Sequence, residues 1–427
     1  MHHDKKEVLN KGLVSFAIKV AGLALGFVLT FYLAKKFGPL GTGIFATTMT
    51  FLQVLSIFTK FGTDGYLLRE ISKSRQLQQG TADLFREISL IVLVFSLIVS
   101  IVLFVLNSQI LQKLFHGNLN KDTFIFIIFS YILYTLLTLN FTFLKAIREI
   151  ALQSFFNYMS LFLFMLLMLV LHKSSYEADA IVKIIFVAIA MSFLFSLVAI
   201  YAKSEKGLSP SVKKIFITHK RIKKIFKLSV PFLLTSALML IMNWIDTIMI
   251  ASLVSSEAVG VYYIVAKFSM IVTLPSVALC NILAPKFSAA FNEKFFSKIN
   301  DLIRWAFGKV AMTSLLIFLA FVLFGEWMLE FYGNDFKEGY SSLLFLSGGQ
   351  LLNSFVGVVA ALFLVAHYEK KFAFIMLLAS IINILLNLLL IPLFEILGAS
   401  IASFCSFVFL FFSSLYIYIK RFRLYHA

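Results

Sequence analysis

The sequence predicts an all-α membrane protein in which twelve transmembrane helices form two six-helix bundles. The first observation is composition: 60% of the 427 residues are hydrophobic and 14% are charged, whereas soluble domains carry about 25% charged residues. The second is that the apolar residues form long runs, and a helix needs about 20 such residues to cross a bilayer. The third is one long basic segment, 203–227, which divides these runs into two equal sets. Disorder is excluded, because disordered chains are poor in aromatic residues.

The apolar runs define the elements in chain order. A polar start, MHHDKKEVLNKG, leads into the first run without a small-residue cleavage site, so we expect the first helix to remain in the protein. The eighth run contains Pro275 and Pro285, and each proline removes a backbone hydrogen bond and favours a kink. We predict an N-terminal lobe of six helices over 1–202, a basic cytoplasmic linker over 203–227, and a C-terminal six-helix lobe over 228–427. The predicted helices are 12–35, 43–69, 86–107, 122–146, 152–171, 180–202, 228–253, 259–285, 303–325, 339–366, 371–391 and 397–419.

The distribution of Lys and Arg predicts the orientation. The formal net charge is +17, which in a soluble protein would favour nucleic-acid binding, but cytoplasmic loops of membrane proteins accumulate Lys and Arg. With a cytoplasmic N-terminus, the outer segments together carry Lys35, Lys36, Lys113, Lys121, Lys173, Lys183 and Lys337. The linker alone carries more: Lys203, Lys206, Lys213, Lys214, Lys220, Arg221, Lys223, Lys224 and Lys227. We therefore expect both termini in the cytoplasm and no nucleic-acid partner.

Four basic residues fall inside predicted helices: Lys19, Lys60, Lys267 and Lys309. A cation at the bilayer centre costs about 2.5–3.5 kcal/mol or more, so it usually faces a cavity or a partner. Lys309 lies near a helix end, and its long side chain can reach the membrane surface. The other three lie deeper. We predict that they line a polar cavity and attract an anionic substrate.

Two acidic residues can pair with these lysines. Asp64 follows Lys60 by four residues, which places both on one face of a continuous helix, and Asp246 and Lys267 lie at matching depth on consecutive helices. Such pairs either hold helices in register or temper the positive potential of a charged cavity, and pairing alone does not decide between these roles. The predicted substrate-binding residues are Lys19, Lys60, Asp64, Asp246 and Lys267.

A weak internal repeat supports two related lobes. Gly43-Ile44-Phe45 aligns with Gly260-Val261-Tyr262 when the two halves of the chain are superposed. Parallel repeats in transporters place the substrate site between the repeats.

Signals for catalysis and for metal or nucleotide binding are missing from the sequence. It contains no GxxxxGK[ST], no HExxH and no CxxC pattern. Cys280 and Cys405 both fall inside apolar runs, where cysteine behaves as a small hydrophobic residue. We therefore expect no catalytic residues, no metal and no cofactor, which leaves a channel, a transporter or a lipid flippase.

Two segments of the N-terminal half resemble a known family. They are FYLAKKFGPLGTGIFATT, after the basic start at Lys11, and FGTDGYLLREIS at 61–72. Together with the twelve-helix plan, they resemble the polysaccharide-export flippases, which are the Wzx-type O-antigen or oligosaccharidyl-lipid flippases of the multidrug/oligosaccharidyl-lipid/polysaccharide superfamily. The resemblance implies two bundles that form a V and are related by a pseudo-two-fold axis. It also implies transport of undecaprenyl-diphosphate-linked oligosaccharide units to the outer leaflet of the bacterial inner membrane by alternating access. The implied partners are the lipid-linked oligosaccharide and membrane lipids, with a polysaccharide polymerase and a chain-length regulator as further candidates.

Two other functions remain open. A cation-coupled multidrug antiporter of the same superfamily would place acids in the first helix, whereas this helix carries Lys19 and no acid after Glu7; Asp246 is the residue that best fits an antiporter. An integral polysaccharide polymerase or ligase would be an enzyme, and it would usually have a large outer loop. All outer loops predicted here are short, which favours the flippase.

Overall fold

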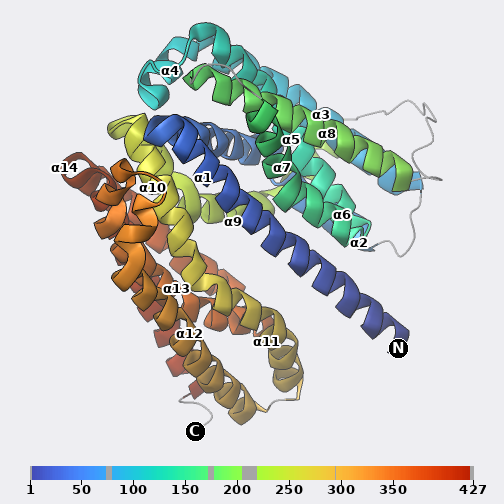
Figure 1. The fold of residues 1–427 in the computed structure, drawn as a ribbon. Helices are drawn as coiled ribbons and strands as arrows, with labels where there is room; N and C mark the ends of the chain where they lie inside the picture. The colour runs from blue at the N-terminus through green and yellow to red at the C-terminus, as the bar shows by residue number, and fades with distance from the viewer. Residues whose placement is uncertain (1, 74–78, 172–176, 204–218, 294, 424–427) are drawn as a thin grey trace. The chain divides into compact units, whose positions relative to one another are not determined.

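The computed structural model describes residues 2–73, 79–171, 177–203, 219–293 and 295–423, which contain helices and turns but no β-strand (Figure 1). Within these ranges, ten helices are long and apolar enough to cross a membrane. Two of them, α1 (His2–Lys60) and α14 (Glu369–Tyr418), each contain one non-helical residue. Divided at those residues, the ten helices give twelve segments. The predicted fold class, a twelve-helix all-α membrane protein, is therefore confirmed.

The break in α1 is encoded by a Gly-Pro pair. Gly38 has φ 64° and ψ −163°, a conformation that glycine adopts without the steric penalty of a Cβ atom. Pro39 follows, and it has no N–H with which to continue the helical hydrogen bonds. In α14 the break falls at Glu395, with φ 50°, three residues after Pro392. Each break separates two membrane-length segments, as the sequence predicts.

The second predicted helix, 43–69, is not continuous, and this expectation is wrong. α1 ends at Lys60, and α2 begins at Thr63 and ends at Lys73. Between them, Phe61 and Gly62 have φ angles of 49° and 74°. Two successive residues in the left-handed region end a helix, in the manner of a glycine C-cap.

The chain divides into two compact units, and the first comprises Met1–Phe37 and Ile44–Ala237. The fifth predicted helix, 152–171, is interrupted by a π-helical turn, η1. A short helix that the sequence did not predict, α4, buries Leu111 and Phe115. Besides α2, the elements of this unit after α1 are α3 (Gln79–Val105), α4 (Asn107–Phe115), α5 (Lys121–Ala146), α6 (Ile150–Phe155), η1 (Phe156–Ser160), α7 (Leu161–Leu171) and α8 (Ala178–Lys203).

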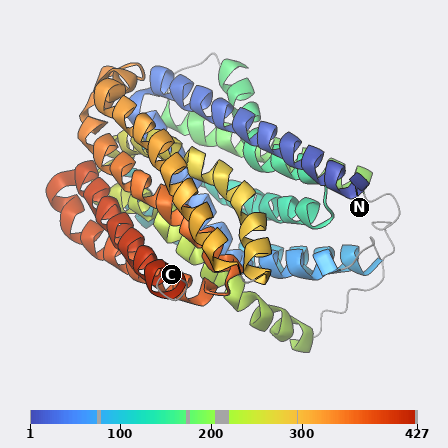
Figure 2. The same ribbon diagram turned by 90° about the horizontal axis from the view of Figure 1, so that it is seen from below.

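The second unit comprises Gly38–Gly43 and Leu238–Ala427. The eighth predicted helix, 259–285, is divided by the 3-10 turn η2 immediately before Pro275, as expected of a proline-induced kink. The elements are α10 (Ser256–Ser269), η2 (Met270–Thr273), α11 (Leu274–Asn292), α12 (Phe296–Glu330), η3 (Asn334–Gly339), α13 (Tyr340–Val365), α14 and η4 (Ile419–Arg423). Within this unit, α12, α13 and α14 run side by side (Figures 1 and 2).

Helix α9 (His219–Leu253) belongs to both units, because the division falls between Ala237 and Leu238. The boundary therefore differs from the expected linker at 203–227. Residues 204–218 of that linker lie outside the described ranges, and the remainder, from His219, forms the first turns of α9. These turns pack within unit 1: the guanidinium of Arg221 lies 2.6 Å from the buried carboxylate of Glu87, and the ring of Phe226 packs edge-on against Phe61.

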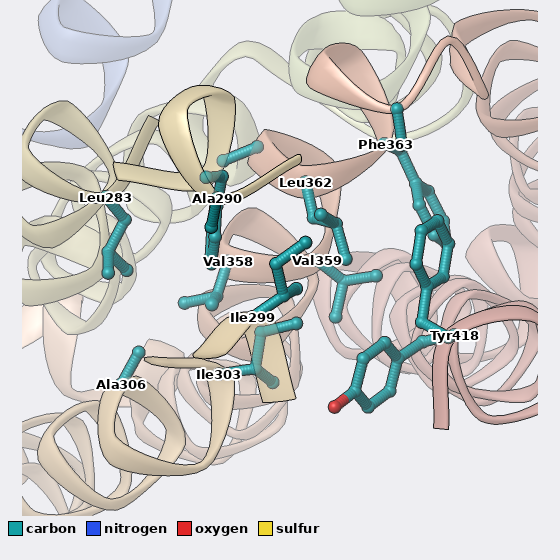
Figure 3. Close-up of a cluster of buried hydrophobic side chains, with 14 of the residues drawn as sticks. Leu283, Ala290, Ile299, Ile303, Ala306, Val358, Val359, Leu362, Phe363 and Tyr418 are labelled. Atoms are coloured by element: carbon teal, nitrogen blue, oxygen red, sulfur yellow. The ribbon is translucent and has the colours of Figure 1, made fainter. Parts of the chain in front are cut away.

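An apolar core holds the helices of unit 2 together at one end (Figure 3). It combines Leu283 of α11, Ile303 of α12, Leu362 and Phe363 of α13, and Tyr418 of α14, all of which are buried. Lipid tails are as apolar as these side chains, so this core is stabilised by close van der Waals packing between the helices. The core fixes the ends of four helices, and α14 carries the polar residues Asn387 and Ser403 elsewhere along its length.

Candidate functional site

The predicted site residues fall in two units. Lys19, Lys60 and Asp64 lie in unit 1, and Asp246 and Lys267 lie in unit 2. Each group is described within its own unit.

Lys60 and Asp64 form an ion pair across the break between α1 and α2. The ammonium Nζ of Lys60 lies 3.2 Å from Oδ2 of Asp64, and Lys60 is buried. The Asp64 carboxylate also accepts a hydrogen bond of 2.9 Å from the backbone N–H of Gly65. The expected pair is therefore present, but it spans a turn rather than one helix face. The turn at Phe61 and Gly62 presents the carboxylate to the lysine.

The other end of α2 carries a charged cluster outside the candidate membrane spans. The carboxylate of Glu70 lies 3.1 Å from Arg69 and 3.0 Å from Lys73. The hydrogen bond from Lys73 is the main cause that holds the pKa of Glu70 below its usual value. The Arg69 guanidinium also lies 5.8 Å from the ring centroid of Phe232 on α9, which is a cation–π distance.

Lys19 is exposed on α1, and its ammonium lies 5.1 Å from the ring centroid of Tyr158. Tyr158 belongs to η1, and π-helical turns frequently occur at functional sites. Nearby, the hydroxyls of Ser15 on α1 and Ser154 on α6 are 2.6 Å apart. The sequence reasoning identified Lys19 but missed Tyr158, because no local pattern announces a π-helical turn.

Asp246 is the centre of a buried hydrogen-bond network in unit 2. Its carboxylate accepts hydrogen bonds from Tyr262 Oη at 2.6 Å, from Asn387 Nδ2 at 2.6 Å and from Ser403 Oγ at 2.5 Å. Asn383 joins the network, since its Oδ1 accepts from Asn387 and its Nδ2 donates to Ser403. The expected partner, Lys267, is none of these three donors. Neutral donors from α10 and from both halves of α14 surround the acid instead.

The Asp246 network consists of oxygen-bearing groups of the kind that bind protons or hard cations. Asn387 Oδ1 is buried and accepts no hydrogen bond from the described part of the chain. Those same residues contain no group of three or more His, Cys, Asp or Glu that could hold a metal ion. A single carboxylate supplies one negative charge, which matches one proton or one monovalent cation.

The remaining two lysines differ in their surroundings. Lys267 is half-buried on α10, with its ammonium 5.8 Å from the ring centroid of Tyr263. Lys309 is exposed on α12, in keeping with its expected reach toward the membrane surface.

The comparisons with known proteins cover most of the chain. A family model described as polysaccharide biosynthesis protein matches residues 8–291, and the MatE family model matches residues 231–389. The probable low-salt glycan biosynthesis flippase Agl15 of Haloferax volcanii is 22% identical over 396 residues, which are 92% of this chain and 79% of that protein.

Solved structures share the fold. An inward closed conformation of the lipid II flippase MurJ superposes with a TM-score of 0.75 at 13% identity, over 96% of this chain and 87% of that one. An inward-facing multidrug resistance MATE transporter of the MOP superfamily superposes with a TM-score of 0.76 at 12% identity, over 97% and 99% of the two chains. These identities show the fold alone. The family match extends over more than half of the sequence, and the chain therefore belongs to the family of polysaccharide biosynthesis proteins.

Proposed function

We propose that this protein is a flippase that carries an undecaprenyl-diphosphate-linked oligosaccharide, such as an O-antigen unit, from the inner to the outer leaflet of the bacterial cytoplasmic membrane. It works by alternating access, with both termini in the cytoplasm. The observation that carries the proposal is a set of three lysines in a chain of the polysaccharide biosynthesis family: Lys19 and Lys267 lie inside candidate membrane spans, and Lys60 lies at the end of one, less deep than the sequence predicted.

The chemistry of the substrate matches these residues. A diphosphate is anionic, and moving an anion out of water is costly unless cations or donors replace the water. Lys19 is exposed and lies beside the Tyr158 ring. Lys60 is buried, and the Asp64 carboxylate partly neutralises its charge. Lys19 therefore offers the more available charge in unit 1, and Lys60 tunes the local potential.

The membrane potential favours the proposed direction. Moving one negative charge out of a cell with a negative interior releases about 2.3 kcal/mol per 100 mV. A diphosphate substrate thus has a driving force that needs no nucleotide.

Export of lipid-linked oligosaccharide tests the function. The wild-type gene is expressed in a bacterial strain that lacks its own flippase, and the inner and outer leaflet pools of lipid-linked oligosaccharide are measured. We expect Lys→Gln at residues 19, 60 and 267 to leave substrate on the inner leaflet when transport is scored per amount of protein, because Lys60→Gln also removes the counter-ion of Asp64. Lys→Arg should retain part of the transport. Full export by the triple Gln variant would show that the lysines are structural.

A second candidate, a cation-coupled multidrug antiporter, is supported by one observation. The MatE family match, residues 231–389, includes Asp246 with its buried network of donors. In such an antiporter, drug efflux would stop when Asp246 is changed to Asn. Drug resistance conferred by wild type and lost in this variant, without any leaflet transfer of oligosaccharide, would favour the antiporter over the flippase.

A further inference from the structure

Unit 1 contains a cavity where α5 and α8 begin. Its volume is about 330 Å³, at the small end of the roughly 300–1,000 Å³ that ligand pockets occupy. The walls bring together carboxylates, an amide, two ammonium groups and one aromatic ring. The lining residues that provide them are Asn120, Lys121, Asp122, Phe126, Glu177, Asp179 and Lys183.

One wall of this cavity is fixed in place by hydrogen bonds. Asp179 is only 8% exposed. One of its carboxylate oxygens accepts from the backbone N–H of Asn120 at 3.0 Å, and the other accepts from the Asn120 side-chain amide. The contact joins the loop before α5 to the first turn of α8. The wall therefore exists before any ligand arrives, which lowers the entropic cost of binding.

An aromatic ring gives the cavity an apolar surface beside its polar wall. Phe126 is half-buried, and its ring packs edge-on against Phe186 of α8, with the centroids 5.5 Å apart. The packing holds the ring at the border of the cavity. An apolar face beside polar groups suits a ligand that is itself amphipathic.

The remaining groups are open to the solvent. Asp122, Glu177 and Lys183 are all exposed, so their carboxylates and ammonium can reach a ligand. A metal ion does not explain the cluster, since the described residues hold no group of three acids or His/Cys ligands that could bind one. The lining instead offers both donors and acceptors around an apolar ring.

We propose that this cavity binds one or two sugar residues of the oligosaccharide head group at the outer face. A sugar hydroxyl can donate one hydrogen bond and accept others at the same time, so carboxylate acceptors beside amide and ammonium donors suit it. The C–H face of the sugar ring can pack on an aromatic side chain. The starts of α5 and α8 are both outer segments in the topology predicted from the Lys and Arg distribution. This inference rests on the proposed function, and it adds a site that lies within one unit.

Saturation-transfer difference NMR on the full chain in lipid nanodiscs tests the site. The probes are free galactose, mannose, glucose and N-acetylglucosamine. We expect at least one of them to receive saturation from the wild-type protein. Glu177→Gln and Lys183→Gln should weaken that binding about 3- to 10-fold, as expected for the loss of one hydrogen bond. The matched control is Lys113→Gln, which removes an exposed lysine of α4 outside the cavity lining and should leave the signal unchanged.

The outcomes separate this site from the proposed function. No signal from any of the four sugars, or equal signals from wild type and both cavity variants, would overturn the sugar site. Export of lipid-linked oligosaccharide by the wild-type protein is scored in a separate assay that does not involve free sugars. A wild type that exports but binds none of the probes refutes the cavity alone, whereas a wild type that binds sugar without exporting refutes the flippase.

Discussion

At the scale of single residues, the surroundings of Asp246 are the most informative. A buried carboxylate that pairs with a lysine is neutralised by the positive charge of the ammonium. The Asp246 carboxylate instead accepts hydrogen bonds from two hydroxyls and an amide. Its partners Asn387 and Ser403 lie 141 and 157 positions away along the chain. No spacing rule on the sequence could identify them, because their proximity depends on how α9, α10 and α14 pack.

Replacement of Asp246 by Ala should destabilise the protein. It leaves three buried donors without their acceptor, and interhelical hydrogen bonds in membranes are worth about 0.6 kcal/mol each on average, so we expect a loss of about 2 kcal/mol. The measurement is the thermal unfolding midpoint of the purified protein in detergent. Asp301→Ala, at an exposed position on α12, is the control and should not change the midpoint. Equal midpoints for both variants would contradict a structural role for the network.

The Lys60–Asp64 pair predicts a compensating double mutant. Lys60→Ala leaves the Asp64 carboxylate without its counter-ion, and uncompensated charges are strongly destabilising. Removing both charges should restore protein abundance in the membrane fraction, measured by quantitative immunoblotting. If Lys60→Ala with Asp64→Ala is no more abundant than Lys60→Ala, the two side chains are not energetically coupled.

At the scale of elements, the Gly38–Gly43 segment of α1 lies very close to α10 within unit 2. A Cβ atom on Gly43 would lie 1.7 Å from the carbonyl oxygen of Ser256, and one on Gly260 would lie 2.0 Å from that of Pro39. The two glycines that align in the internal repeat thus pack on each other's segments. Only a residue without a side chain permits such an approach of two backbones.

Gly43→Ala and Gly260→Ala should therefore each lower stability, because the new methyl group collides with backbone that cannot rotate away. Thermal unfolding in detergent gives the measurement, and we expect a clear decrease in both variants. Gly308→Ala in α12 is a matched control, since a Cβ there meets nothing within 4 Å. It should be neutral or slightly stabilising, because alanine favours a helix over glycine by about 1 kcal/mol. A Gly43→Ala protein as stable as wild type would mean that the two backbones can separate at no cost.

The elements also show how far hydropathy can predict structure. Apolar runs predicted twelve membrane-length segments, including the gap between 12–35 and 43–69 in which Gly38 and Pro39 lie. Pro275 predicted a further break, because proline acts through local backbone chemistry. The break at Phe61–Gly62 was missed because the four-residue spacing of Lys60 and Asp64 also fits one continuous helix. The short helix α4 and the π-helical turn at Tyr158 were missed for a different reason, because both depend on packing with neighbouring helices and not on a local sequence pattern. Of the candidate site, the Lys60–Asp64 pair was predictable from spacing, whereas the donors around Asp246 were not.

At the scale of the whole molecule, the chain forms two units that do not correspond to its two halves. The six-and-six division of the sequence places the boundary at 203–227, but the first unit extends through α9 to Ala237 and omits Gly38–Gly43. The Arg221–Glu87 ion pair and the Phe226 packing explain this extension, because they bind the start of α9 to α3 and to the end of α1.

Topology is the property of the whole chain that is tested most directly. Reporter fusions at Lys206 and Ala427 should behave as cytoplasmic, and fusions near His116 and Asn334 should behave as external, because Lys and Arg concentrate in the segments predicted inside. The readout is a pair of reporters active on opposite sides of the membrane. One fusion with reversed activity would invalidate the alternation on which the predicted orientation rests.

The segment Gly38–Gly43 belongs to unit 2, although the residues on both sides of it belong to unit 1. This has a consequence for biosynthesis. The turn is made early, but Ser256 and Gly260, against which it packs, emerge roughly 200 residues later, about 10–40 s at 5–20 residues per second. Unit 1 is likewise incomplete until the ribosome has made α9. The Gly38–Gly43 segment therefore cannot reach its final packing until α10 has been made, and it remains unpacked in the bilayer during that interval. In a Thr42→Cys variant, a ribosome stalled after α8 should accordingly leave this buried position reactive toward a cysteine-specific probe, and extension of the chain through α10 should protect it.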